Sequence, residues 1–408
     1  MSGALSDARA VVVVGLAGLV ASCAPEGPSS VTPVDVAPMD GVLLVASSVD
    51  DVRGPHARIE RWVFGGGEPE VTTLEEPRSD VMHVVRCDPA VPGGFLSGAG
   101  NDARISRWSL DRGAWRASDL FHVQFRPGFS RVRDFEIVDR ARLGVGDGLA
   151  LAVGTHDGGL VALVGLDHGE VRELDRADST FVHEIEVGDL DGDGLDEIYA
   201  TTSPPNAVAL GAPQRGDILR LSPRAGTREV LVHLEDRHAK EILVEDVDRD
   251  GRDELYAVIE GRLDEARQLV APVEIRAIGS DGSMRTIASL PDAMTRFLAT
   301  ADLDGDGQRE LVAATFSHGL HWLRRAADGA WSSEAIDEVS GGFEHAITVG
   351  DLDHDGRDEL YEADDPRGEL RRIRLGREGI VREILARYPA GSRITWSLAT
   401  CPATPGGA

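Results

Sequence analysis

The sequence predicts an all-β fold in which a four-stranded unit is repeated around a ring. Three observations support this: an acidic cassette that returns four times, short apolar runs on both sides of each cassette, and two chain ends that complete one another. The cassettes start at Asp189, Asp246, Asp302 and Asp351, so they recur at intervals of 57, 56 and 49 residues. Such a period is typical of one supersecondary unit repeated along or around an axis.

Each cassette has the form D-x-D-x-D-G with a Glu at its ninth position. Carboxylates at positions 1, 3 and 5 converge on one hard cation when the backbone curls around it, and glycine at position 6 permits the sharp turn. We therefore predict four Ca²⁺ sites, because carboxylates crowded in this way would otherwise repel one another. Acidic turns that bind no metal are the alternative. The predicted ligands are Asp189, Asp191, Asp193, Glu197, Asp246, Asp248, Asp250, Glu254, Asp302, Asp304, Asp306, Glu310, Asp351, Asp353, Asp355 and Glu359.

The EF-hand shares this opening, but it requires a Glu at position 12 and a helix on each side of the loop. Position 12 is occupied by Ala200, Ala257, Ala313 and Glu362. An alternating apolar run that is typical of a β-strand follows each cassette. The cassettes are therefore predicted to be turns between strands.

A strand is also predicted before each cassette, at residues 181–187, 238–244, 294–300 and 343–349. Two further copies without a full cassette lie upstream, at residues 131–137 and 80–86. Three more strands follow in each unit, and in the unit that starts at Phe181 they are predicted at residues 197–202, 217–222 and 228–234. Four strands per unit is the plan of a β-propeller blade.

The two chain ends supply one further blade. Residues 40–47, 57–64 and 70–74 match the second, third and fourth strands of a blade, and residues 394–401 match an isolated first strand. Joining them gives a seven-bladed β-propeller over residues 40–402, closed by the C-terminal strand, which removes an open sheet edge. Cys87 and Cys401 then fall at equivalent places on adjacent inner strands, where a disulfide and two free thiols both remain open.

The repeated unit resembles the FG-GAP/VCBS repeat of integrin α-subunit propellers and of many bacterial secreted proteins. Those blades carry D-x-[DN]-x-D-G-x-x-[DE] in the turn between their first two strands. The resemblance covers nearly the whole chain after the N-terminal segment, with full motifs in blades four to seven and degenerate ones in blades one to three. It implies a propeller with structural calcium, but the family includes adhesion receptors, lectins and lyases, so it implies no single activity.

The N-terminal segment predicts export and lipidation. Residues 11–21 form an apolar run that is too short to span a bilayer but suits the core of a signal peptide. Small residues followed by Cys23 resemble the lipobox of bacterial lipoproteins. We predict a signal peptide over residues 1–22, lipidation at Cys23, a flexible tether over residues 23–39, and a lipid-anchored location in the bacterial cell envelope. An ordinary cleaved secretion signal is the alternative.

The net charge of −28 argues against binding to nucleic acid, and it leaves the predicted anchor as the only membrane contact. At the face opposite the cassettes, the residue six places before each cassette is mostly cationic. The predicted ligand-binding residues are Arg133, His183, Lys240, Arg296, His345 and Trp396, with Met82 at the same place in the second blade. A positive rim would attract an acidic sugar, a carboxylated peptide or a phosphate ester. Alternatively, these cations only neutralise neighbouring carboxylates.

Motifs for a nucleophile elbow, a P-loop or a zinc protease are absent from the sequence. The favoured function is therefore that of a calcium-stabilised binding module for a carbohydrate or a protein. An acidic-polysaccharide lyase or dehydratase that uses the central funnel is one alternative, and a structural envelope protein is another. The carboxylates at position 8 of three cassettes, Asp196, Asp253 and Asp358, are expected to face solvent.

Overall fold

A computed structural model describes residues 39–52, 54–125, 130–205 and 213–402 of the chain. The predicted signal peptide, Cys23 and all but the last residue of the predicted tether lie outside these residues. Met39, that last residue, is buried against Leu43 and Trp62. No helix among the described residues has the length and hydropathy of a membrane span.

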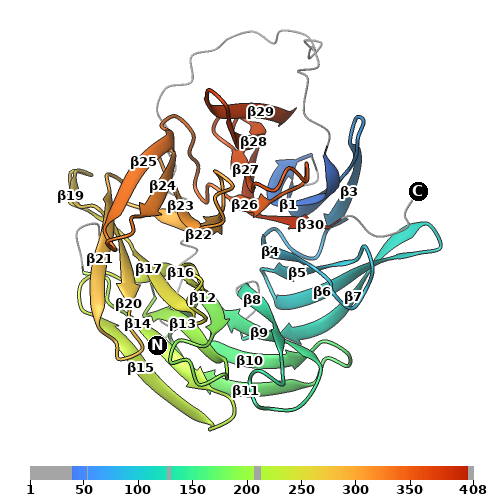
Figure 1. The fold of residues 1–408 in the computed structure, drawn as a ribbon. Helices are drawn as coiled ribbons and strands as arrows, with labels where there is room; N and C mark the ends of the chain where they lie inside the picture. Colours follow the sequence, from blue (N-terminus) through green and yellow to red (C-terminus); the bar gives the residue numbers. More distant parts are fainter. Residues whose placement is uncertain (1–38, 53, 126–129, 206–212, 403–408) are drawn as a thin grey trace, which may run out of the picture. The chain divides into compact units, whose positions relative to one another are not determined.

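The described residues form seven four-stranded antiparallel sheets, arranged as the blades of a propeller (Figure 1). We number the blades from the N-terminus. Blade one contains β1 (Asp40–Asp51), β2 (Gly54–Gly65), β3 (Glu70–Glu76) and β30 (Arg393–Cys401). Blade two contains β4 (Met82–Cys87), β5 (Phe95–Ala99), β6 (Ala103–Asp111) and β7 (Ala114–Val123). Blade three contains β8 (Val132–Asp139), β9 (Leu149–Thr155), β10 (Leu160–Gly165) and β11 (Val171–Arg176).

Blades four to seven carry the cassettes. Blade four contains β12 (Phe181–Gly188), β13 (Glu197–Ser203), β14 (Gly216–Ser222) and β15 (Thr227–Leu234). Blade five contains β16 (Ala239–Glu245), β17 (Glu254–Ile259), β20 (Val273–Ile278) and β21 (Met284–Leu290), with the added hairpin β18 (Arg262–Leu263) and β19 (Leu269–Ala271). Blade six contains β22 (Thr295–Ala301), β23 (Glu310–Thr315), β24 (Leu320–Arg325) and β25 (Trp331–Asp337). Blade seven contains β26 (Ile347–Gly350), β27 (Glu359–Asp364), β28 (Glu369–Gly376) and β29 (Gly379–Arg387).

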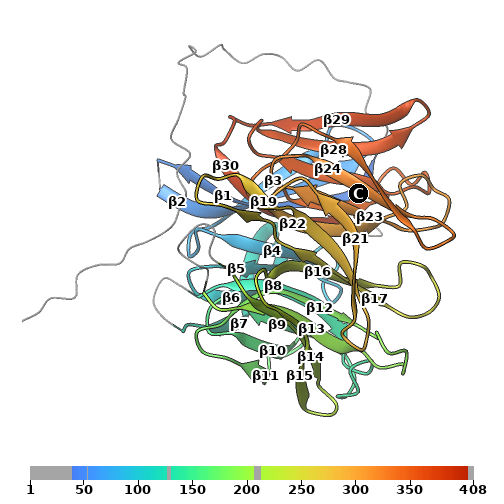
Figure 2. The ribbon, with the colours of Figure 1, turned by 90° about the vertical axis from the view of Figure 1, so that its left-hand side faces the viewer.

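The ring is closed by its two ends, as predicted. The C-terminal strand β30 pairs with β1, with Val42 opposite Cys401 and Val49 opposite Arg393, and the two strands lie side by side in Figure 2. A disulfide joins Cys87 at the end of β4 to Cys401 at the end of β30. The closing strand is therefore held by hydrogen bonds within blade one and by a covalent bond to blade two.

The hydrophobic core lies between neighbouring sheets. Val84 and Ile105 of blade two pack in one cluster with Phe135 and Leu151 of blade three. Equivalent clusters fill the other interfaces between successive blades. Because each face of a blade is apolar where it meets its neighbour, the blades are stabilised by stacking around the ring.

Candidate functional site

Four acidic clusters lie in the turns between the first and second strands of blades four to seven. The turns join β12 to β13, β16 to β17, β22 to β23 and β26 to β27. In each turn, ligand atoms from the Asp residues at positions 1, 3 and 5 lie within 4.8 Å of one another. Carboxylate oxygens gathered at this spacing can hold a metal ion, and oxygen-only ligation suits a hard cation.

The turn that starts at Asp189 shows how the backbone forms such a cluster. The first carboxylate accepts hydrogen bonds from the backbone N–H groups of Gly192 at 2.7 Å, Asp193 at 3.0 Å and Gly194 at 2.7 Å. Gly194 has φ of +88°, a conformation that favours glycine. The position 6 glycines of the other three turns have the same sign of φ, at +91°, +85° and +85° for Gly251, Gly307 and Gly356.

The Glu at position 9 joins its cluster in only one turn. Glu254 lies within 4.8 Å of its three Asp partners, whereas the other three clusters contain the Asp residues alone. Burial raises the pKa of Glu254 to about 7, and the charge of Asp248 adds to the shift. In blade seven, Glu359 Oε1 instead accepts a hydrogen bond of 2.5 Å from the buried Arg372. That arginine also pairs with Asp353, so the acidic turn of blade seven already contains an internal cation.

The position 8 residues do not face solvent as expected; they connect neighbouring blades. Asp253 of blade five accepts a 2.7 Å hydrogen bond from the backbone N–H of Asp189 in blade four. Asp358 of blade seven does the same for Asp302 of blade six, at 2.8 Å. Asp196 accepts a 2.5 Å hydrogen bond from Arg142 of blade three. The expectation was wrong because neighbouring turns of the ring approach closely enough for a short side chain to bridge them.

At the opposite ends of the inner strands, a β-bulge occurs in every blade except the seventh. The pairing skips one residue on β4, β8, β12, β16, β22 and β30. A bulge leaves the extra residue unpaired and changes the direction of its side chain. The bulged residues are His83, Arg133, His183, Lys240, Arg296 and Trp396.

Five of the six predicted ligand-binding residues are therefore bulge residues near the centre of the ring. His345, the sixth, precedes β26 and is buried, and its ring nitrogens contact Glu362 Oε1 of blade seven at 2.8 Å and the Thr315 carbonyl of blade six at 2.6 Å. In blade two, Met82 lies in the core and His83 occupies the bulge. The count of six residues back from each cassette missed His83, because blade two lacks the full cassette that sets the register.

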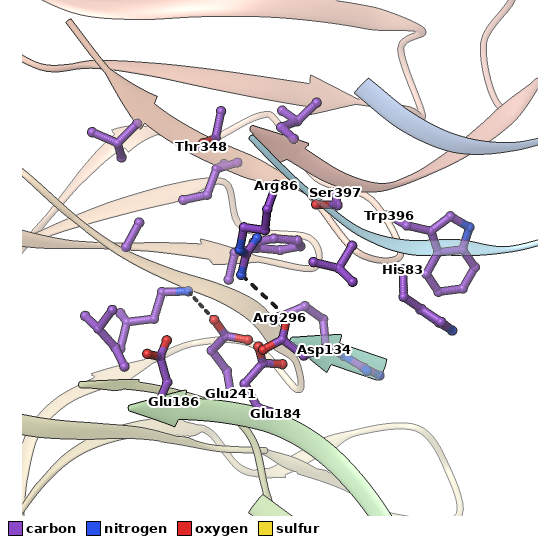
Figure 3. Close-up of a pocket in the computed structure, with 18 of the residues that line it drawn as sticks. His83, Arg86, Asp134, Glu184, Glu186, Glu241, Arg296, Thr348, Trp396 and Ser397 are labelled. Carbon is purple, nitrogen blue, oxygen red and sulfur yellow. Dashed lines mark hydrogen bonds and ion pairs between the residues drawn. The ribbon is translucent and has the colours of Figure 1, made fainter. Parts of the chain in front are cut away.

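A cavity of about 310 Å³ lies among the inner strands (Figure 3). His83, Arg133, Arg296 and Trp396 contribute to its wall, and His83 and Trp396 contact one another with ring centroids 4.7 Å apart. Arg86 of β4 also lines it, and β8, β12 and β16 contribute an acidic wall whose members are Asp134, Glu184, Glu186, Glu241 and Glu245.

Figure 3 shows four of these carboxylates close together beside Arg86. Arg86 pairs with Asp134 at 3.5 Å and with Glu136 at 2.5 Å. Burial raises the pKa of Glu184 well above its usual value, and the neighbouring charges of Asp134 and Glu241 raise it further. The pKa values of Glu186 and Glu241 are also raised, first by burial. Glu184, Glu186 and Glu241 therefore retain protons at a pH at which exposed carboxyls are ionised.

Replacing Glu184 by Gln is expected to raise the melting temperature, and to raise it most at alkaline pH. A carboxyl whose pKa is higher in the folded state binds more protons there, so its contribution to stability falls as pH rises from about 4.3, the usual value, through the folded pKa. Gln has no charge in the folded or the unfolded state, so the variant does not lose this stability as the pH rises. Melting curves between pH 5 and 9 test this, with Glu378→Gln in an exposed turn as the control. A pH-independent loss of stability would contradict it.

A second and larger pocket, of about 500 Å³, lies between blades four, five and six. We call it the blade-five pocket. One part of its wall is apolar and is formed by Leu263, Leu269, Pro291, Met294 and Phe316. The polar part includes His238, Lys240, Glu260, Arg262, Arg267, Arg296 and His318. A pocket of this size, with an apolar wall and a few convergent charges, is typical of a small-molecule site.

The charges in this pocket differ in how they are paired. Arg296 Nε lies 3.3 Å from Glu260 Oε1, and His238 Nε2 lies 3.6 Å from Glu260 Oε2. Among the described residues, neither Arg262 nor Arg267 forms an ion pair. Both belong to the β18–β19 hairpin segment, an addition that among the described residues only blade five carries. The sequence pattern did not identify Arg262 or Arg267, because an insertion outside the repeat gives no indication of which of its side chains face a pocket.

Residues 302–361 match the family model of the FG-GAP-like repeat. A comparison with curated proteins finds no match. Among solved structures, the chain is similar to a protein from Lactobacillus plantarum, with 10% identity, a TM-score of 0.55, and coverage of 89% of this chain and 99% of that one. It is also similar to a putative 6-phosphogluconolactonase from Bacteroides fragilis, with 10% identity, a TM-score of 0.52, and coverage of 90% and 99%.

A putative 6-phosphogluconolactonase from Bacteroides uniformis gives 12% identity, a TM-score of 0.50, and coverage of 88% and 99%. At these identities the likeness concerns the fold alone. The repeat match and the arrangement of seven four-stranded sheets agree with the FG-GAP resemblance of the cassettes. The chain is a seven-bladed β-propeller, and its residues 302–361 match the FG-GAP-like repeat.

Proposed function

We propose that the protein is an extracytoplasmic binding module that takes an acidic carbohydrate in the blade-five pocket. The observation that carries this proposal is the pair of arginines, Arg262 and Arg267, that line the pocket without an ion pair among the described residues. A guanidinium binds a carboxylate through two parallel hydrogen bonds. The apolar part of the wall can contact the C–H face of a sugar ring, and about 500 Å³ is enough for a small saccharide.

The binding test compares methyl glucuronide with methyl glucoside by calorimetry. Binding of the glucuronide alone is expected, because only its carboxylate can pair with the arginines. The double variant Arg262→Ala, Arg267→Ala is expected to weaken binding by about tenfold or more, since a hydrogen bond to a charged group contributes about 1.5–3 kcal/mol. Arg377→Ala, in the exposed turn between β28 and β29, is the matched control. Equal binding of both glycosides, or of neither, would contradict the proposal.

A lyase acting on an acidic polysaccharide is the second candidate, because Lys240 lies in the same pocket and burial lowers its pKa to about 7. A base with such a pKa could remove the α-proton of a uronate. Turnover of polyuronates to unsaturated products, lost in Lys240→Ala, would support this function. Binding without turnover would favour the binding module. Absence of both binding and turnover would favour a structural envelope protein.

We also propose that the acidic turns bind Ca²⁺ and that this binding stabilises the propeller. The support is the clustering of three carboxylates in each of four turns. A site saturated at 100 times its Kd adds about 2.7 kcal/mol to the free energy of unfolding. Melting curves are expected to shift upward with CaCl₂ and downward with EDTA. Asp304→Asn is expected to reduce the rise in melting temperature caused by CaCl₂. Asp147→Asn, in the turn of blade three that lacks a cluster, is expected to leave it unchanged. A melting temperature unaffected by EDTA would contradict the proposal.

The location remains a proposal from the N-terminal sequence. Cys23 and the residues around it lie outside the described residues. We propose lipidation at Cys23, which would anchor the propeller to the bacterial cell envelope. Metabolic labelling with a palmitate analogue is expected to mark the wild-type protein and not Cys23→Ser; equal labelling of both would exclude this anchor.

A further inference from the structure

Lys240 is the single lysine of the 408-residue chain, in which every other Lys or Arg position is an arginine. It occupies the bulge of β16, is 4% exposed, and contributes to the wall of the blade-five pocket. Arginine remains protonated at any physiological pH, whereas a buried lysine can lose its proton and act as a nucleophile. The chain therefore places its only lysine side chain at the wall of the blade-five pocket.

A chain of hydrogen bonds orients the amine. Ser203 Oγ donates to the Pro204 carbonyl at 2.8 Å, so this oxygen is free to accept from His183 Nε2, which also lies 2.8 Å away. We therefore assign the proton of the neutral His183 ring to Nε2, which leaves Nδ1 as an acceptor. Lys240 Nζ lies 3.3 Å from Nδ1. His183 can therefore accept a proton from the amine.

The charges that face Lys240 come from several blades. Burial is the main cause that lowers its pKa to about 7; Arg296 and Arg133 lower it too, and Glu260 and Glu344 oppose the shift. Burial and then the charge of Lys240 lower the pKa of His238 to about 4. The pKa of His183 is lowered well below its usual value by the same two causes. Both imidazoles are therefore neutral near pH 7, and a large fraction of the amine is unprotonated.

We propose that Lys240 forms an imine with the aldehyde or ketone group of an acidic sugar held in the blade-five pocket. The neutral Nζ attacks the carbonyl carbon, and a proton passes from Nζ by way of His183 Nδ1 to the oxygen, which gives a carbinolamine. Loss of the hydroxyl group as water, with a second proton supplied from Nζ, leaves a C=N bond and no change in oxidation state. Arg262 and Arg267 would hold the carboxylate of the same ligand.

The test uses D-glucuronate, which carries both an aldehyde and a carboxylate, and sodium borohydride, which reduces an imine to a stable secondary amine. We expect one adduct per chain, on the tryptic peptide His238–Arg249. The rate at pH 7 should exceed that of the protein in guanidinium chloride by more than about tenfold, because an unfolded lysine has a pKa of about 10.4. The pH dependence of the folded protein should have its midpoint near 7. His183→Ala is expected to slow the reaction about tenfold, and added imidazole is expected to restore part of the rate, which a purely structural role would not allow.

Controls separate the covalent step from binding. Lys240→Arg should give no adduct on this peptide while it retains the far-UV spectrum of the wild type. Methyl glucuronide, whose aldehyde is blocked, should compete with glucuronate and form no adduct, and this measurement on the wild type needs no variant. The imine proposal rests on the proposed function. Glucuronide binding without an adduct at Lys240, or an adduct only at the α-amine, would overturn the imine proposal alone. Absence of both binding and adduct would overturn both proposals.

Discussion

Deletion of residues 390–408 is expected to abolish the stable monomeric propeller. This deletion removes β30, and with it the pairing to β1 and the disulfide between Cys87 and Cys401. Loss of a native disulfide alone costs about 2–5 kcal/mol, which is a large part of the usual stability of a folded domain. In addition, β1 becomes an open edge with unpaired N–H and C=O groups, which promotes aggregation.

Size-exclusion chromatography and thermal melting of the truncated protein test this expectation. Deletion of residues 403–408 alone is the matched control, because it leaves β30 and Cys401 in place. The double variant Cys87→Ser, Cys401→Ser separates the covalent contribution from the strand pairing, and it should lower stability without aggregation. A monomeric truncated protein with the wild-type melting temperature would show that blade one does not need its fourth strand.

Arg372→Ala is expected to lower the free energy of unfolding by about 3–5 kcal/mol, the range for removal of one partner of a buried ion pair. The Arg372 side chain is 0% exposed, and it contacts Glu359 at 2.5 Å and Glu383 at 3.2 Å, and also Asp353. Its removal would leave Asp353 and Glu359 without this arginine, while Glu383 would keep its pair with Arg374. Urea unfolding of the two proteins measures the difference.

Arg374→Ala is the control for this experiment. Arg374 is two residues away on β28 and also pairs with Glu383, at 3.1 Å, but its side chain is 31% exposed. A pair of this kind is expected to contribute less than about 1 kcal/mol. Added Ca²⁺ should recover part of the stability lost in Arg372→Ala, because the cation can take the place of the guanidinium between Asp353 and Glu359. Equal losses in the two variants would contradict the assigned role of Arg372.

The sequence predicted the architecture well because the repeat constrains it. The cassette interval, the strand runs and the complementary chain ends gave the seven blades and their closure, and the structure has the strands within a few residues of the predicted ranges. The glycine at position 6 was predicted for its turn, and all four glycines have positive φ. These features depend on local geometry, which a sequence pattern carries.

The functional face was harder to predict because it depends on register and on insertions. Blade two has no full cassette to set the register, so the count placed Met82 where His83 lies. The same count included His345, which has φ of +52° ahead of β26 and contacts Glu362 of its own blade and Thr315 of blade six. Contacts across blades, such as that of Asp253 with Asp189, join residues far apart in the sequence and leave no local pattern.

The position 8 contacts have a consequence for the way in which the acidic turns would fill. Asp253 joins the turns of blades four and five, and Asp358 joins those of blades six and seven. Arg309 of blade six, at position 8 of its cassette, pairs with Glu245, next to the turn of blade five. An ion that orders one turn would also order part of the neighbouring turn. That turn would then lose less conformational entropy when it binds its own ion. Successive cations would then bind with positive cooperativity, and a titration curve would be steeper than that of four independent sites.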